Sequence, residues 1–197
     1  VGAILGSLCA GFLMIGQLGL WSSLKVIYLL YLALAFLTAL LAGTGMKRHM
    51  AWAVGGLALI LHFSTHGGRY PLVYLGAEGN QELVAVVEGS HSITSVVKVR
   101  TPGQEDSLSL VLNNKYILGG TRPAFVANQR AQTVVPMSLH PKARSLFYLG
   151  MGTGITADTA LRYDVDHVTV CELVPEVVQA ARGYLSEHVG RLFTDPR

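Results

Sequence analysis

A glycine-rich turn followed by an acidic residue is the part of the sequence best suited to bind a small molecule. An apolar run, 146–149, leads into the turn 150–154 (GMGTG), and a helix-compatible segment, 155–162, follows. A second apolar run, 167–171, ends on Glu172. This order of strand, glycine turn, helix, strand and acid is that of the first half of a nucleotide-binding βαβ unit.

The turn and the acid suit an adenosine-type ligand. The glycines are Gly150, Gly152 and Gly154, and Glu172 lies 22 positions after the first of them. Amide groups at the start of the next helix can face an anion, and two carboxylate oxygens match the two hydroxyls of a ribose. Because Ile155 directly follows the third glycine, the pattern is GxGxG, which disfavours a dinucleotide. A purely structural turn with a solvated Glu172 is the alternative.

The elements around this turn are predicted from periodicity and turn signals. Residues 82–88, 93–100, 108–112 and 115–118 have the β-branched content of strands, and Asn113-Asn114 favours a tight hairpin turn. We therefore expect a small antiparallel sheet of about four strands. Helices are expected at 123–135 and 175–188, each with a proline in its first turn.

The N-terminal third of the chain is predicted to lie in a membrane. Residues 1–64 contain no Asp or Glu, and three hydrophobic segments occur at 1–20, 24–42 and 51–63. About 20 apolar residues are needed to cross a bilayer as a helix. A cleaved signal peptide is disfavoured because a second long apolar run follows the first within a few residues.

The side of the membrane on which the polar part lies depends on the third segment. Lys47, Arg48 and His49 are expected on the cytoplasmic side. The segment 51–63 is short, so it either spans, which places the polar part opposite, or re-enters, which keeps it cytoplasmic. We favour the cytoplasmic arrangement in a multi-pass protein of the bacterial inner membrane, because adenosine-derived cofactors are cytoplasmic.

Charge and metal-ligand patterns narrow the function further. The net charge of +3 belongs to the apolar part, and the remainder carries twelve basic and twelve acidic residues, so no nucleic-acid surface is expected. Cys9 and Cys171 have no disulfide or zinc spacing. His62 and His66 could share a helix face, but interfacial histidines are favoured over a metal pair, and no metal is expected.

The predicted fold class is α/β: transmembrane helices, then a small antiparallel hairpin sheet, then the first half of a Rossmann-like, methyltransferase-type domain. The boundaries are 1–66 for the transmembrane helices, 67–79 for a linker, 80–120 for the hairpin subdomain and 121–197 for the cofactor-binding domain. Because the chain begins at Val1 and stops just after a turn-like Thr-Asp-Pro, we expect a fragment.

Three stretches carry a resemblance to a known family: LFYLGMGTGITADTAL, VTVCELVPEVVQAARGYL and the terminal DPR. Together with the expected hairpin sheet, they resemble the spermidine synthase family, the polyamine aminopropyltransferases, and most of all its membrane-fused branch. The resemblance implies transfer of an aminopropyl group from decarboxylated S-adenosylmethionine to a polyamine such as putrescine. It also implies a lipid membrane as a partner and is compatible with a homodimer.

The resemblance also implies roles for single residues. Gly150, Gly152, Thr153 and Gly154 would hold the cofactor's side arm, Glu172 would bind the ribose hydroxyls, and Gln129 would line the substrate cleft. In the family the catalytic base is an Asp on a later strand, which is expected beyond Arg197. The acids that follow the turn are expected to be solvated and are poor candidates for the base; they are Asp158, Asp164 and Asp166.

The sequence departs from the family at several of these positions. Soluble members carry an acid inside the glycine turn, where this chain has Thr153, and a Tyr where it has Asn128. A Gln of the first hairpin is not evident near Ser92, and Val174 replaces an acid. Two alternatives therefore stay open: an S-adenosylmethionine-dependent methyltransferase-like enzyme, and a membrane protein that binds a nucleoside or polyamine without turnover.

Overall fold

The computed structural model describes residues 1–42, 45, 49–50, 52–58, 73, 75, 79–90 and 92–197. The chain forms two compact units, Val1–Leu72 and Val73–Arg197, each of which is described by itself. Lys47, Arg48, His62 and His66 lie outside the described residues, so the predictions that rest on them stay predictions.

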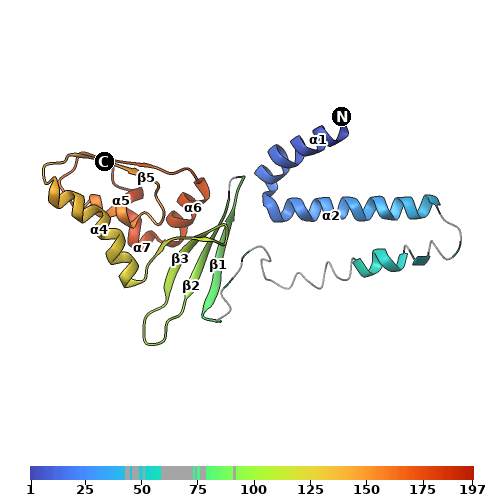
Figure 1. Ribbon diagram of the computed structural model, residues 1–197, viewed down its shortest axis with the longest axis horizontal. Coiled ribbons are helices and arrows are strands. Elements are labelled where there is room, and N and C mark those ends of the chain that lie inside the picture. Colours follow the sequence, from blue (N-terminus) through green and yellow to red (C-terminus); the bar gives the residue numbers. More distant parts are fainter. Residues whose placement is uncertain are drawn as a thin grey trace. The chain divides into compact units, whose positions relative to one another are not determined.

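The first unit begins with a long apolar helical run (Figure 1). It comprises α1 (Gly2–Leu8), the π-helical segment η1 (Cys9–Met14) and α2 (Ile15–Ala42). Gly19, with φ of 78°, interrupts the run, and the Ser23 hydroxyl donates to the Gly19 carbonyl at 2.6 Å. This break coincides with the end of the predicted segment 1–20. Among the described residues, one helix, Gly2–Thr38, is long and apolar enough to cross a membrane.

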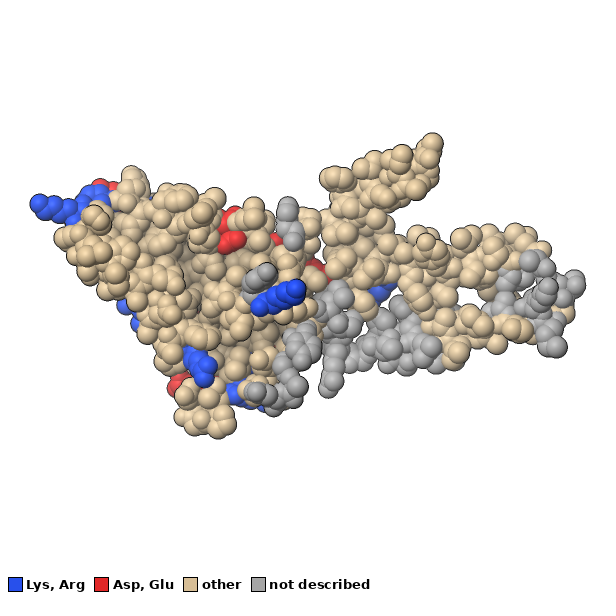
Figure 2. Space-filling view, viewed as in Figure 1, with Lys and Arg blue, Asp and Glu red and all other residues tan. Residues whose placement is uncertain are grey.

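A second helical stretch, 52–58, packs against α2 within the same unit. The rings of Phe36 and Trp52 meet edge to face with centroids 4.4 Å apart, and the Tyr28 hydroxyl donates to the Ala58 carbonyl at 2.8 Å. These two contacts make the stretch antiparallel to α2. It covers the described part of the predicted segment 51–63, whose spanning or re-entrant nature remains a prediction. On the face that Figure 2 shows, charged atoms are sparse among the described residues of this unit.

The second unit starts with the antiparallel sheet that the sequence predicts. Its strands are β1 (Gln81–Glu88), β2 (Ile93–Val99), β3 (Ser107–Leu112) and β4 (Tyr116–Gly120), paired in that order. The turn before β4 has Asn113 and Asn114 at φ of 50° and 60°. Asparagine tolerates this left-handed backbone better than most residues, which confirms the hairpin signal.

The βαβ part follows in the predicted order (Figure 1). The parallel strands β5 (Ser145–Leu149) and β6 (His167–Cys171) flank α5 (Ile155–Ala160), and α4 (Pro123–Leu139) precedes them. The order strand, glycine turn, helix and strand is thus confirmed. Helix α4 continues four residues beyond the prediction, because Pro136 is accommodated inside it.

The last predicted helix, 175–188, is divided in the structure. Helix α6 (Pro175–Tyr184) ends before Leu185, and the short α7 (Ser186–Val189) and the 3₁₀ turn η2 (Gly190–Phe193) follow. Leu185 has the non-helical angles φ −114° and ψ 16°, and its side chain is fully buried. The chain therefore turns at Leu185 so that this side chain and Val189 both enter the core.

One hydrophobic cluster joins the sheet to the βαβ part. Val96 of β2 and Leu110 of β3 are fully buried with Ala180 and Ala181 of α6 and with Ile155 of α5. Helix α6 contacts β1, β2 and β3. Each fully buried aliphatic side chain contributes about 1.5–3 kcal/mol, so this shared core fixes the hairpin sheet relative to the glycine turn.

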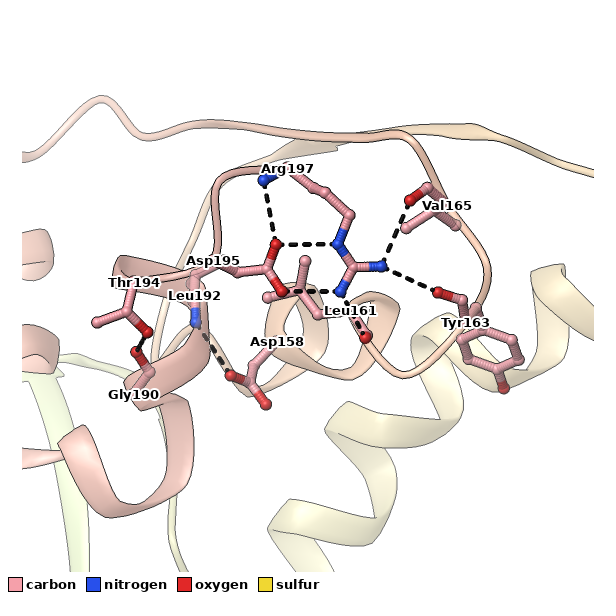
Figure 3. A network of polar contacts seen from close by, with 9 residues as sticks. All are labelled: Asp158, Leu161, Tyr163, Val165, Gly190, Leu192, Thr194, Asp195 and Arg197. Carbon is pink, nitrogen blue, oxygen red and sulfur yellow. Dashed lines mark hydrogen bonds and ion pairs between the residues drawn. The ribbon is translucent and has the colours of Figure 1, made fainter.

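Arg197 fastens the chain's last residues to the end of α5 (Figure 3). Its guanidinium donates to the Asp195 carboxylate at 2.9 and 2.7 Å, and also to the carbonyls of Leu161, Tyr163 and Val165. These three carbonyls belong to the segment that follows α5, so the network ties this segment to the last residues. These hydrogen bonds hold the pKa of Asp195 at about 2, below its usual value of 3.8.

Candidate functional site

The glycine turn joins β5 to α5 and lies against the end of β4. All three of its glycines have positive φ, and the Gly150 amide donates to the Cys171 carbonyl at 2.7 Å. At Gly152, a Cβ atom would lie 3.0 Å from the carbonyl oxygen of Leu118. A side chain there would be strained in φ and crowded by the sheet, so the close approach of turn and sheet depends on glycine.

Glu172 closes the turn from the end of β6. Its Oε2 accepts the amide of Met151 at 2.7 Å and that of Gly152 at 3.4 Å, and its Oε1 accepts the amide of Val174 at 2.9 Å. The carboxylate is half-buried. Each of its two oxygens is thus held by at least one backbone amide. A carboxylate oxygen has about two acceptor sites, so Oε1 keeps one site for a ligand hydroxyl, and a hydroxyl at Oε2 would replace the long bond from Gly152.

Thr153, the residue where the family has an acid, is paired inside the protein. Its side chain is 1% exposed, and its hydroxyl donates to Gln129 Oε1 while accepting the amide of Ile155 at 3.4 Å. Gln129 Nε2 in turn donates to the carbonyls of Gly120, at 3.0 Å, and Phe125, at 2.9 Å. The sequence prediction placed Gln129 at the cleft but did not reveal its bond to the turn.

A pocket of about 280 Å³ lies between the end of β4 and α4, and Gln129 is part of its lining. Its lining combines apolar side chains with three amides, and none of the lining residues is charged. The residues are Ile117, Leu118, Gly119, Phe125, Asn128, Gln129 and Gln132. The pocket can accommodate a short chain and offer it amide hydrogen bonds.

A half-buried hydroxyl network that the sequence analysis missed connects α4 to β5 and α5. The Thr133 hydroxyl lies 2.8 Å from the Tyr148 hydroxyl and 2.6 Å from the Thr156 carbonyl oxygen. Burial raises the pKa of Tyr148, whereas its hydrogen bond to Thr133 acts in the opposite direction. The sequence offered one signal for this network. Gln129 and Thr133 are four residues apart, and such residues lie next to each other on one face of a helix.

The acids after the turn divide into two kinds. Asp158 was expected to be solvated, and this was wrong: it is 5% exposed, and its Oδ1 accepts the amide of Leu192 at 3.2 Å. Asp158 lies on the inner face of α5, where it anchors η2. Asp164 and Asp166 are exposed and pair with Arg144.

Within the described ranges, no three His, Cys, Asp or Glu side chains gather as metal ligands would.

Comparison with known proteins shows similarity over part of the chain. No family model matches. The polyamine aminopropyltransferase of Lachnoclostridium phytofermentans is 37% identical over 54 residues, or 27% of this chain and 19% of that protein. The polyamine aminopropyltransferase of Thermotoga petrophila is 39% identical over 64 residues, or 32% of this chain and 21% of that protein. The matched stretches thus span about a fifth of these relatives.

The fold also has a counterpart among solved structures. A crystal structure of a spermidine synthase in complex with the transition-state analogue AdoDATO has a TM-score of 0.51 and 23% sequence identity. The alignment covers 58% of this chain and 38% of that one. At this identity the likeness shows the fold alone. The sequence matches and the shared fold together confirm the resemblance of this chain to the spermidine synthase family, the polyamine aminopropyltransferases.

Proposed function

We propose that the glycine turn and Glu172 bind the adenosyl part of decarboxylated S-adenosylmethionine. The observation that carries the proposal is the position of the Glu172 carboxylate, which bridges the amides of Met151 and Val174. Its Oε1 keeps one acceptor site, and a second hydroxyl at Oε2 would replace the long 3.4 Å bond from Gly152. A ribose offers two adjacent hydroxyl donors that suit this arrangement. Gly150, Gly152, Thr153 and Gly154 then form the wall beside the ligand.

The proposed activity is that of a membrane-anchored, spermidine-synthase-like aminopropyltransferase with a polyamine acceptor such as putrescine. The curated relatives carry the name polyamine aminopropyltransferase, which supports this class of reaction. In aminopropyl transfer, an amine attacks the carbon next to the sulfonium and methylthioadenosine leaves. The task of this chain's residues is to align the two partners. We propose that the acceptor enters the pocket lined by Gln129.

The membrane anchor is proposed from the surface of the N-terminal unit. Phe12 and Leu41 are 79% and 80% exposed, and the helix Gly2–Thr38 is almost entirely unburied in its most apolar stretch. Exposed apolar surface of this extent is stable in lipid but not in water. We propose a multi-pass arrangement in a bacterial inner membrane with the second unit in the cytoplasm.

A second candidate, transfer of a methyl group from S-adenosylmethionine, is favoured by one observation. Thr153 has a neutral hydroxyl, bound to Gln129, at the position where the family carries a carboxylate. An ammonium group of the ligand therefore gains no ion pair from this position, and the carboxylate that only S-adenosylmethionine carries meets no repulsion there. The glycine turn and the ribose-binding acid would serve either cofactor equally.

Product analysis distinguishes the candidates. The full-length protein in detergent or nanodiscs is incubated with decarboxylated S-adenosylmethionine and putrescine, and separately with S-adenosylmethionine, and the products are separated by liquid chromatography and mass spectrometry. Methylthioadenosine together with spermidine supports aminopropyl transfer. S-adenosylhomocysteine from the second reaction would replace the proposal by methyl transfer. Binding of methylthioadenosine without turnover in either reaction would indicate a binding protein.

A further inference from the structure

We propose that Gln129 is a positioning residue that couples the glycine turn to the hairpin sheet, with Thr153 as its partner in the turn. The proposal concerns the same site as the proposed function and rests on it for the ligand, but the coupling itself is a property of the protein alone. It assigns the Gln129 amide to holding the turn rather than to binding the substrate.

The first argument is that the hydrogen-bonding capacity of Gln129 is almost fully used within the protein. Both hydrogens of Nε2 are directed to backbone carbonyls, those of Gly120 at the end of β4 and Phe125 in α4. Its Oε1 accepts the Thr153 hydroxyl. A primary amide has two donors and one oxygen with two acceptor sites. A single acceptor site therefore remains for a ligand in the pocket.

The second argument is that Thr153 is equally committed. Its hydroxyl has one hydrogen, which it donates to Gln129, and its oxygen accepts the amide of Ile155 at the start of α5. The side chain is 1% exposed. A ligand cannot reach this hydroxyl without breaking a buried hydrogen bond, which is costly when the partner is left unsatisfied.

The third argument is the close packing around the pair. A Cβ atom at Gly119 would lie 2.7 Å from Gln129 Oε1 and 3.1 Å from Thr153 Cγ2. The backbone of β4 therefore lies directly on the pair, and Leu118 meets Gly152 in the same way. The glycine turn is held between β4 and α4, with the Gln129 amide as the polar connection among all three.

The consequence is that the sheet influences the cofactor site without contacting the cofactor. The turn's conformation sets the direction of the Met151 and Gly152 amides, and these amides orient Glu172. Removing the Gln129–Thr153 bond frees the turn on its β4 side. The amides of 150–155 should then exchange faster with solvent. Ligand binding should also weaken, because binding would have to order the turn that the bond now keeps ordered.

The test is a double-mutant cycle on the full-length protein in detergent. Thr153→Val and Gln129→Leu each remove the bond, and Thr153→Ser retains the hydroxyl. Ser138→Ala is the matched control, because it removes one exposed side-chain hydrogen bond from the same helix. Two measurements are made on each variant: hydrogen–deuterium exchange of residues 150–155 without ligand, and the Kd for methylthioadenosine.

We expect Thr153→Val and Gln129→Leu to accelerate exchange in 150–155 and to weaken binding by about five- to tenfold each. The double variant should bind no more weakly than Gln129→Leu alone, since Gln129→Leu already removes the bond to Thr153, together with those to Gly120 and Phe125. Ser138→Ala should match the unmodified protein in both measurements, and Thr153→Ser, which keeps the hydroxyl, should keep the slow exchange of residues 150–155. If methylthioadenosine does not bind the unmodified protein, the proposed function fails, and the exchange data still test the coupling. Unchanged exchange in 150–155, or additive effects on Kd, would overturn the positioning role.

Discussion

The carboxylate of Glu172 lies 2.7 Å from the amide nitrogen of Met151, so the acid at the end of β6 is hydrogen-bonded to the glycine turn at the end of β5. The parallel pairing of Leu149 with Cys171 brings these two strand ends together. Residues more than twenty positions apart in the chain thereby form one continuous wall of amides and carboxylate oxygens.

The first prediction concerns the variant Glu172→Gln. An amide replaces one acceptor oxygen by a donor, which would face the amides of Met151 or Val174 and could not accept a ribose hydroxyl. The affinity for methylthioadenosine should fall by about 1–3 kcal/mol, measured by isothermal titration calorimetry. Glu187→Gln, which changes an exposed acid on α7, is the control and should bind normally. Equal affinities of the two variants for methylthioadenosine would indicate that Glu172 has only a structural role.

The second prediction concerns the variant Thr153→Asp, which restores the acid typical of the family. The new carboxylate would face Gln129 Oε1, an acceptor, in a site that is 1% exposed. If the Gln129 amide rotated to present Nε2, its oxygen would face the carbonyls of Gly120 and Phe125 instead.

Either arrangement leaves buried acceptors without donors, so the free energy of unfolding should fall by about 1–3 kcal/mol or more. Thermal unfolding of the purified full-length protein measures this, with Thr153→Ser as the control that keeps the hydroxyl. A Thr153→Asp variant as stable as the unmodified protein would show that the pair can rearrange at little cost.

The third prediction compares two glycines. Gly119 has φ of 127°, and its added Cβ would lie 2.7 Å from Gln129 Oε1, whereas Gly183 lies on α6 with open space around it. Gly119→Ala should lower the unfolding temperature. Gly183→Ala should leave it unchanged or raise it, because alanine in a helix is favoured over glycine by about 1 kcal/mol. An unfolding temperature of Gly119→Ala at or above that of the unmodified protein would contradict the crowding at Gly119.

The fourth prediction is a pH dependence. Arg197 holds the pKa of Asp195 at about 2, below its usual 3.8, so the charged pair stabilises the fold above about pH 4. This stabilisation is lost as pH falls toward 2, where the folded protein also takes up the proton. The unfolding temperature of Asp195→Asn should therefore lie below that of the unmodified protein at pH 6, and the gap should narrow toward pH 2. Glu105→Gln, an exposed acid of the β2–β3 turn, is the control; a gap independent of pH would contradict the linkage.

Local patterns determined most of the secondary structure. The hairpin strands, the turn at Asn113-Asn114 and the order of β5, turn, α5 and β6 depend on side-chain alternation and on glycine and asparagine at positive φ, which neighbouring residues decide. The same holds for the apolar helices, whose length and lack of charge are visible in the sequence. The C-terminal end of α4 was missed because Pro136 is accommodated inside the helix, and the division of α6 from α7 was missed because burial of Leu185 depends on the packed core.

The sequence by itself named Gly150, Gly152, Gly154 and Glu172 as one candidate site, and the resemblance to the family added Gln129 and Thr153. The tertiary structure decided how they are connected: Glu172 to the amide of Met151, and Gln129 to Thr153 and the end of β4. It also turned Asp158 inward, where it holds the amide of Leu192. Spacing along the chain cannot specify these contacts, since a buried hydrogen bond forms only where the packed core brings a donor and an acceptor within about 3 Å of each other.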